Sequence, residues 1–427
     1  MLLNPNLNPM NSTEIFEAAS KSRLLKDPYV EKIWALMSDK NLFSKSPDYL
    51  GKLRRSLLRD ALDYFSRRSD YYRGLFERLG IRPRDAEPED LAKLAVPSDV
   101  LRGEGHKQFL IKDLEENGEF FTSSGTTNPN PVKVYRSPLD LAIMILGNTY
   151  LFEYVYGKEV ERERGIALFM AAPELRHRLN FVAFVHLTLE SKKIPLLYGM
   201  NLVEGTTDGK PWQKLVPNQE NILRFLRSRE EPKLLFTPPA GVYLLSKKFE
   251  DMNMVQRLAY RLLKIMPINL GRGGVIVTGG GTKGFDLPPY DKIVEFSRKY
   301  FVSRGRDGGA QEVPFMDVYG MTETLTAMLD RFGEMDKIPH PLSEVFILNP
   351  KTFELAREED AEGIVGIFNP FTTSWLEIFY PGDIMRSHPS NRYYGREYVF
   401  VRRLSVDEGW SLQRACGGTL EELMGRG

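Results

Sequence analysis

The spacing of apolar and polar residues changes twice along the chain. In residues 13–95, apolar residues recur every third or fourth position with charged residues between them, as in YLGKLRRSLLRDALDYFSRR. This spacing places the apolar side chains on one face of a helix, so we predict a helical N-terminal region over 1–100. The many Arg and Lys residues of 52–68 have acidic neighbours, and the total charge of the chain is balanced. We interpret them as a solvated helix surface rather than a face that binds nucleic acid.

From about residue 100, short apolar runs alternate with helical stretches. The runs end in glycine or proline and predict buried strands: GIALFMAA (165–172), KLLFTPP (233–239), GGVIVTGGG (273–281) and VPFMDVYG (313–320). Helical periodicity lies between them at 218–231 and 290–301. Strand–helix alternation predicts an α/β core over 101–340. Ligands of such sheets bind at the carboxyl ends of the strands, where these glycine turns fall.

A third pattern begins near residue 340. SEVFILNP, EGIVGIFNP, LEIFYPGD and YVFVRRL are short strand-like runs separated by turn residues. They predict an antiparallel β subdomain over 341–400. A short C-terminal segment, 401–427, then carries the tail SLQRACGGTLEELMGRG, in which we expect a short helix.

The composition of the chain limits the classes of function that it can have. A chain of 427 residues is expected to form more than one compact unit. Its net charge of +1 gives no electrostatic footprint for nucleic acid. No apolar run approaches the ~18 residues of a membrane span, and the N-terminus lacks the pattern of a signal peptide. One cysteine excludes a multi-cysteine metal site, so we expect a cytoplasmic enzyme with no membrane span.

The segment FFTSSGTTNPNPVKVYRS (120–137) concentrates hydroxyls, glycine and a cation in one turn. Such a turn can wrap backbone N–H groups, hydroxyls and a point charge around a polyphosphate. An ordinary polar surface loop has a similar composition, so that interpretation stays open. The candidate phosphate-binding residues are Thr122, Ser123, Ser124, Gly125, Thr126, Thr127 and Lys133.

A second glycine turn, VIVTGGGTKG (275–284), follows a predicted strand. Its glycines have the spacing of a dinucleotide-binding motif, but two prolines follow where a helix should start. We therefore interpret Gly279, Gly280 and Gly281 as the wall of a slot for a flat ring, with Lys283 at its edge.

DVYGMTET (317–324) ends another predicted strand. Tyr319 could stack on a purine beside Gly320, Thr322 could bind a phosphate, and Glu323 could ligate Mg²⁺. A strand end followed by a helix cap is the alternative interpretation.

Asp383 and Cys416 are two further candidate site residues, because of the residues next to them in the sequence. Asp383 follows a Pro-Gly turn, where it could accept both ribose hydroxyls or serve as a plain turn residue. Cys416 lies between Arg414 and a Gly-Gly pair, where a nearby cation could lower the pKa of its thiol; a small buried side chain is the alternative. The chain has no G-x-S-x-G motif, which disfavours a serine hydrolase.

The order TSSGTT…K, TGGGTK, VYGMTET and YPGD resembles that of the adenylate-forming superfamily of acyl-CoA synthetases, adenylation domains and luciferases. The chain looks closer still to the acyl-protein synthetase family, the acid-activating component of the bacterial luminescence fatty-acid reductase. FTSSGTT, the GGG-x-K string, HPLSEVFILNPKTFEL and RACGGTLEEL carry that resemblance, which spans about 120–420. It implies an α/β, adenylate-forming-enzyme-like large domain with layered sheets and helices, a helical N-terminal leader, a β subdomain and a much reduced C-terminal domain.

The resemblance implies the roles of the candidate residues. The 122–133 loop would hold the phosphates of ATP, Gly279–Gly281 and Tyr319 would frame adenine, and Asp383 would bind the ribose. Thr322 would touch the α-phosphate or the acyl carboxylate, Glu323 would bind Mg²⁺, and Cys416 would accept the acyl group as a thioester.

Several features depart from the family pattern. Thr282 stands where the closer family usually has tryptophan, and Asn128-Pro129-Asn130 stand where glycine is usual. The chain after Asp383 is also too short for the mobile C-terminal domain of acyl-CoA synthetases. The lysine of that domain has no assignable counterpart, and Lys133, Lys283 and Arg402 are the candidate cations.

The implied substrate is a carboxylic acid, in the closer family a fatty acid, and the implied partner is a reductase or acyltransferase that takes the acyl group. Two alternatives stay open. The acyl group could pass to coenzyme A or a carrier protein without self-acylation, or the chain could be a non-catalytic nucleotide- or partner-binding scaffold.

Overall fold

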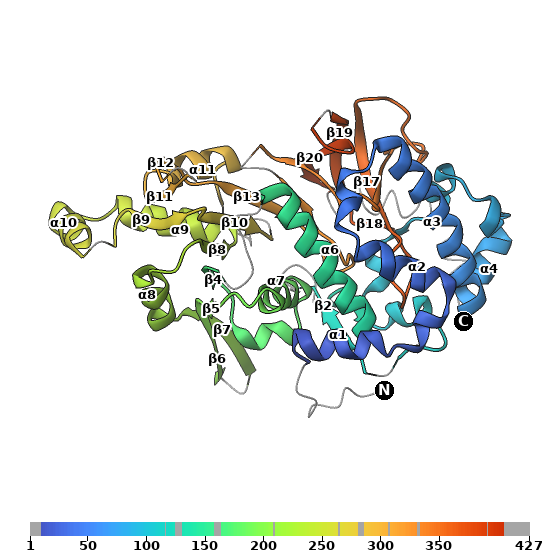
Figure 1. Cartoon of the computed structure of the whole chain (residues 1–427), viewed down its shortest axis with the longest axis horizontal. Helices are drawn as coiled ribbons and strands as arrows, with labels where there is room; N and C mark the ends of the chain where they lie inside the picture. Colours follow the sequence, from blue (N-terminus) through green and yellow to red (C-terminus); the bar gives the residue numbers. More distant parts are fainter. Residues whose placement is uncertain are drawn as a thin grey trace. The chain divides into compact units, whose positions relative to one another are not determined.

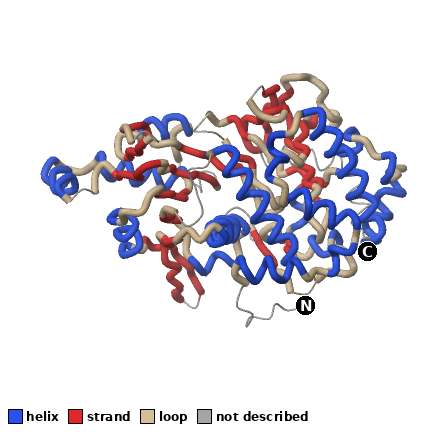
Figure 2. Tube along the Cα trace, in the orientation of Figure 1, coloured by secondary structure: helices blue, strands red, loops and turns tan. Residues whose placement is uncertain are grey.

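The computed structural model describes residues 10–115, 117–123, 130–157, 164–207, 210–263, 265–280, 286–305, 308–330, 334–390 and 392–404 (Figures 1 and 2). The chain forms two compact units, and each contains several stretches that are separated in the sequence. The first comprises Met1–Thr13, Thr149–Gly320 and Leu329–Met335, and the second comprises Glu14–Asn148, Met321–Met328 and Asp336–Gly427. Each is described by itself below, and the four regions expected from the sequence stay a prediction.

A six-stranded sheet forms the centre of the first unit. Its order is β14-β13-β10-β8-β4-β5, and the pairs from β13 to β5 are all parallel. The strands are β4 (Ile166–Phe169), β5 (Leu196–Tyr198), β8 (Lys233–Thr237), β10 (Val275–Gly279), β13 (Phe315–Tyr319) and β14 (Met328–Leu329). The four apolar runs that predicted strands thus supply β4, β8, β10 and β13. Because these strands are buried, their sequences are continuously apolar rather than alternating.

Helices accompany this sheet along the chain: α7 (Asn180–Ser191), α8 (Gln219–Arg227), α9 (Pro239–Glu250), α10 (Met254–Leu262) and α11 (Tyr290–Ser297). α6 (Pro138–Tyr156) begins in the second unit and ends in the first. A smaller sheet contains β9 (Ile268–Arg272), β11 (Phe301–Arg304) and β12 (Ala310–Glu312). The hairpin of β6 (Met200–Thr207) and β7 (Lys210–Pro217) was not predicted, because its mixed polar sequence lacks a clear alternation.

The second unit is built on a seven-stranded sheet. The strands are β1 (Val96–Pro97), β15 (Asp336–Lys337), β16 (Glu344–Leu348), β17 (Ala361–Asn369), β18 (Glu377–Tyr380), β19 (Asp383–Ser390) and β20 (Gly395–Arg403). They run in the order β1-β18-β17-β19-β20-β15, with β16 beside β17. Each described pair is antiparallel except β1 with β18, which confirms the predicted antiparallel character. β19 was missed, because Pro389 and the polar residues around it hide the strand.

Helices cover part of this sheet, and they confirm the helical character predicted for the N-terminal region. They are α1 (Ser12–Ser20), α2 (Pro28–Met37), α3 (Pro47–Arg68), α4 (Asp70–Leu79) and α5 (Leu91–Leu94). Asp27 and Ser46 cap α2 and α3 through their side chains, each followed by proline at the first helical position. Short 3-10 helices occupy Arg23–Lys26, Lys40–Ser44, Pro83–Asp85, Pro88–Asp90, Ser98–Leu101, Gly105–Phe109 and, in the first unit, Pro173–His177.

Buried tyrosines join the helices to the chain that links β17 and β18. The hydroxyls of Tyr29 and Tyr64 donate to the carbonyls of Pro370 (2.7 Å) and Thr373 (3.0 Å). In Figure 1, α2 and α3 lie beside the β17–β18 part of the sheet. Among the described helices, none combines the length and the apolar character needed to cross a membrane.

Candidate functional site

The predicted phosphate loop is carried by a two-stranded hairpin of β2 (Glu119–Thr122) and β3 (Lys133–Arg136). Thr122 and Lys133 lie opposite each other at the end of the hairpin that carries the loop. The N–H of Ser123 donates to the Val132 carbonyl (3.0 Å), and the N–H of Val132 donates to Ser123 Oγ (3.1 Å). Ser123 therefore closes the base of the loop. Ser124, Gly125, Thr126 and Thr127 lie outside the described residues.

Lys133, at the start of β3, is half-buried, and its Nζ lies 4.4 Å from the centre of the Phe120 ring. A cation over an aromatic face is stabilised by the ring quadrupole. The hairpin thus holds the Lys133 ammonium over Phe120, two residues before the loop end of β2, and its role in binding phosphate stays a prediction.

Arg136, at the end of β3, is fully buried and was missed by the sequence analysis. Its Nη1 lies 3.1 Å from Oε1 of Glu377 on β18, and its Nη2 donates to the carbonyls of Thr322 (3.1 Å) and Glu323 (2.7 Å). One guanidinium therefore holds the hairpin, the 322–323 turn and β18 together. Lys133 lies three residues earlier on the same strand, which corresponds to about 10 Å of extended chain.

Both carboxyl groups near Arg136 are buried. Burial raises the pKa of Glu377 to about 8, and Arg136 opposes that rise. Burial also raises the pKa of Glu323, against the opposing effects of Ser98, Arg102 and Arg136. A carboxylate is an oxygen ligand of the type Mg²⁺ prefers, and a bound cation would favour its ionised form. Glu323 thus fits the predicted role as one ligand of Mg²⁺.

Asp383 begins β19 immediately after Gly382, whose φ of 81° is in the left-handed region that favours glycine. The carboxylate is buried and accepts from Nε (2.7 Å) and Nη2 (3.2 Å) of Arg403 on β20. Arg402, the neighbouring residue on β20, is exposed and pairs with Ile384 across the strands. A carboxylate offers about four acceptor positions, so the Arg403 fork leaves Asp383 chemically suited to accept ribose hydroxyls as well.

The predicted adenine frame lies in the first unit. β10 and β13 are parallel neighbours in which Gly279 is paired with Val318, so Gly280 and Tyr319 both lie at the carboxyl ends of these strands. A side chain at Gly279 would place its Cβ 3.2 Å from the Val318 carbonyl oxygen. Tyr319 is half-buried, Gly320 is exposed and Gly280 has a φ of 86°. Gly281 and Lys283 lie outside the described residues.

A hydrogen-bond network lies one residue before Gly279 on β10 and Val318 on β13. Thr278 Oγ1 donates to Oδ1 of Asp317 (2.8 Å), its partner across β10 and β13. Because that bond uses the only hydroxyl proton of Thr278, the Tyr290 hydroxyl, 2.6 Å away, must be the donor in the second contact. Burial raises the pKa of Tyr290, so the hydroxyl keeps its proton. The network fixes the two strand ends against α11.

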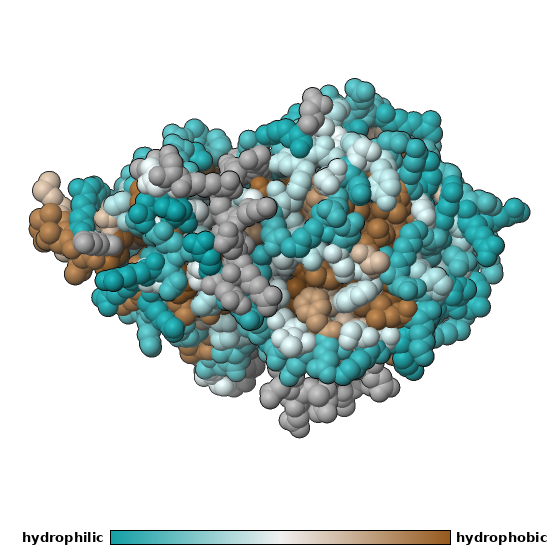
Figure 3. Space-filling view, viewed as in Figure 1, coloured by the Kyte–Doolittle hydropathy of each residue, from teal (hydrophilic) through white to brown (hydrophobic). Residues whose placement is uncertain are grey.

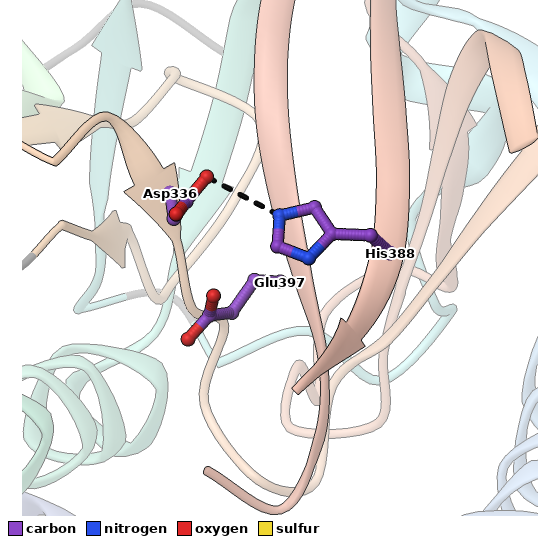
Figure 4. Close-up of side chains that lie close together, drawn as sticks. All are labelled: Asp336, His388 and Glu397. Carbon is purple, nitrogen blue, oxygen red and sulfur yellow. Dashed lines mark hydrogen bonds and ion pairs between the residues drawn. The ribbon is translucent and has the colours of Figure 1, made fainter. Parts of the chain in front are cut away.

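A second group of metal-ligand side chains, unpredicted, lies in the second unit (Figure 4). Asp336 on β15, His388 on β19 and Glu397 on β20 have ligand atoms within 4.8 Å of one another. His388 Nε2 lies 3.2 Å from Asp336 Oδ1. Arg392 Nη2 lies 3.9 Å from Asp336 and 3.7 Å from Glu397, and Ser390 Oγ donates to Glu397 (2.9 Å). Arg392 supplies a cation to both carboxylates, so these side chains form an ion-pair network.

The predicted site residues thus form two groups that the structure describes. Gly279, Gly280, Tyr319 and Gly320 belong to the first unit, whereas Thr122, Ser123, Lys133, Thr322, Glu323, Asp383 and Arg402 belong to the second. Their roles as binding or catalytic residues stay predictions. Cys416 and the tail helix expected around it lie outside the described residues.

Comparison with known proteins gives a likeness in fold. No protein-family model and no curated protein matches the sequence. Solved structures of 2-hydroxyisobutyryl-CoA ligase do match. The postadenylation state, in complex with R3-HIB-AMP, aligns with a TM-score of 0.59 at 12% identity, covering 86% of this chain and 70% of that one. The thioesterification state, with 2-HIB-AMP and CoA, aligns with a TM-score of 0.57 at 11% identity, covering 86% and 70%.

An open conformation of the same ligase, with 2-HIB-AMP and CoA, gives a TM-score of 0.54 at 12% identity over 83% of this chain and 69% of that one. The chain therefore has the fold of an adenylate-forming enzyme, which confirms the α/β class with layered sheets and helices. At this level of identity the likeness establishes the fold alone.

Proposed function

We propose that this protein is an ATP-dependent ligase that activates a carboxylic acid as an acyl-adenylate and passes the acyl group to a thiol. The observation that carries the proposal is the order of the four motifs on the fold of a ligase whose solved structures hold acyl-adenylates. Gly280 and Tyr319 at adjacent strand ends support it, because ligands of α/β sheets bind at the carboxyl ends of strands.

Each group of residues has a proposed role. Gly279–Gly281 and Tyr319 frame the adenine, and Asp383, held by Arg403, accepts the ribose hydroxyls. Residues 122–127 and Lys133 bind the phosphates. Thr322, whose backbone carbonyl Arg136 holds, contacts the α-phosphate or the acid. Glu323 ligates Mg²⁺, which when bound neutralises phosphate charge.

The proposed reaction has two steps. A carboxylate oxygen of the acid bonds to the α-phosphorus of ATP, and the bond to the departing pyrophosphate breaks. A thiolate then attacks the acyl carbon, and AMP leaves with the bonding electron pair. Protein groups contribute mainly by positioning the reactants and offsetting charge. Lys133, Lys283 and Arg402 are the cations proposed to stabilise the charge that develops in the first step.

Two thiols are candidate acceptors. We propose Cys416, on the resemblance to acyl-protein synthetases, with a fatty acid as substrate and a reductase or acyltransferase as the protein that receives the acyl group. Coenzyme A is the second candidate, and it is favoured by its presence in two of the matching ligase structures. A thiol is intrinsically nucleophilic, so either acceptor needs modest activation.

A pyrophosphate-exchange screen over carboxylic acids of increasing chain length tests the adenylation step. We expect acid-dependent exchange for at least one acid. ATP binding with no exchange for any acid would favour the non-catalytic scaffold. Labelling with the active acid then separates the acceptors. Self-acylation predicts a hydroxylamine-labile adduct that Cys416→Ala abolishes while exchange survives, whereas transfer to coenzyme A predicts acyl-CoA release unaffected by that substitution.

A further inference from the structure

Helix α10 exposes a row of large apolar side chains. Met254 is 85% exposed, Val255 77%, Leu258 58% and Leu262 76%. Met254, Leu258 and Leu262 follow one another at intervals of four, so they lie along one face of the helix, with Val255 beside them. Leu263, directly after the helix, is 64% exposed. In Figure 3 this face contributes the brown surface at the left end of the view.

The face of α10 that packs against its unit is the opposite one. Within the helix, Tyr260 is the residue that is half-buried, and its ring lies 6.3 Å from that of Phe249 on α9. Tyr260 is two residues from both Leu258 and Leu262, about 200° around the helix axis. A surface helix of a globular protein normally turns its apolar face inward. α10 has the reverse orientation.

This helix is well formed. Asn253 Oδ1 accepts from the N–H of Gln256 (2.9 Å), and the Gln256 side chain accepts from the N–H of Asn253 (3.1 Å), which makes a capping box. At the other end, the N–H of Leu263 donates to the Ala259 carbonyl (2.9 Å). The apolar face is therefore a preformed surface.

Basic side chains border the apolar face. Arg257 and Arg261, four residues apart, lie on the flank next to Met254, and Arg257 also donates to the Glu250 carbonyl. Lys247 and Lys248 of α9 line the groove between α9 and α10 together with Asp251 and Tyr260, on the side of the helix away from the apolar face, so Arg257 and Arg261 are the cations that border that face. Apolar side chains bordered by cations suit an anionic, apolar layer.

We propose that α10 is a membrane-contact element that lies in the headgroup region of an anionic lipid bilayer. A helix of nine residues is about 13 Å long, and one of its faces is much smaller than the ~800 Å² a stable protein partner covers. α10 also lies at the outer edge of its unit in Figure 1, where a flat bilayer can reach it. The inference is independent of the proposed function.

Flotation of the full-length protein with lipid vesicles tests the proposal. We expect binding to vesicles of phosphatidylcholine with 30% phosphatidylglycerol, and at least fivefold weaker binding to pure phosphatidylcholine. L258E/L262E should reduce binding at least tenfold, because it places two charges in the apolar layer. The matched control is V203E/L215E on the β6–β7 hairpin, where both side chains are also exposed (39% and 40%). It should bind like the wild type.

Two outcomes would overturn the proposal: no vesicle binding by the wild type, or equal binding by L258E/L262E. A dimer that light scattering detects in the wild type and not in L258E/L262E, without vesicle binding, would instead assign the face to a second copy of this chain. Pyrophosphate exchange with a water-soluble acid is measured separately. It should be unchanged in L258E/L262E, which keeps failure of this proposal distinct from failure of the proposed function.

Discussion

Arg136 and Glu377 form an ion pair, 3.1 Å from Nη1 to Oε1, in which both side chains are fully buried. The pair joins β3 to β18, and the same guanidinium holds the carbonyls of Thr322 and Glu323. Arg136 therefore positions the turn that carries two proposed site residues.

Removing Arg136 should destabilise the second unit strongly. Arg136→Met leaves Glu377 and two buried carbonyls without their partner, and we expect a loss of about 3–5 kcal/mol in the free energy of unfolding. Urea unfolding measures the change. The double variant Arg136→Met/Glu377→Met should recover part of the loss, because it removes the stranded carboxyl group. A single variant as stable as the wild type would contradict this account.

Glu377 should make stability depend on pH. Its folded pKa of about 8 is above the ordinary value near 4.3, so the folded state binds more protons between these values. The associated stability is complete below about pH 4.3 and is lost as the pH rises through 8. Relative to Glu377→Gln, the wild type should lose up to about 1.4 kcal/mol per pH unit in this window. If the free energies of unfolding of the two proteins changed with pH in the same way, the raised pKa of Glu377 would be excluded as the cause.

Asp383→Asn should weaken ATP binding. An amide accepts hydrogen bonds at one oxygen instead of two, so we expect the KM for ATP to rise about tenfold with a smaller change in kcat. Steady-state pyrophosphate exchange gives both constants. Arg403→Gln is the control: it removes the fork but keeps the carboxylate, and the arginine side chain is largely exposed. We expect it to change the KM less. A larger rise in the KM for ATP in Arg403→Gln than in Asp383→Asn would argue against Asp383 as the residue that binds the ribose.

Gly280→Ala should impair exchange more than it impairs folding. The residue has a φ of 86°, so alanine is strained there by about 1 kcal/mol. Gly80, with a φ of 66° at the end of α4, has open space around it and provides the matched control. Both variants should lose similar stability by thermal unfolding, and exchange should fall in Gly280→Ala alone. Equal exchange in the two variants would argue against Gly280 lining the nucleotide site.

Much of the fold could be predicted from local patterns. The apolar runs over 165–172 and 273–281 became β4 and β10, and the periodic segment 290–301 contains α11. β19 and the β6–β7 hairpin were missed, because polar residues and Pro389 conceal strands whose partners, rather than their own composition, keep them extended. The candidate site residues also differ in whether the local sequence reveals them. Glycine turns and Asp383 stood out by their neighbours in the chain, whereas nothing in the sequence around Arg136 indicated that it is buried.

The sequence by itself determined the α/β class and the turns that end its strands, because periodicity and the conformational limits of glycine and proline act over a few residues. Tertiary structure decided which charges are buried and which apolar face stays outside. Arg136 and Glu377 are 241 positions apart, and the orientation of α10 depends on the packing of Tyr260 against Phe249. Burial is a property of the assembled chain, since solvent is excluded by residues that come together when it folds.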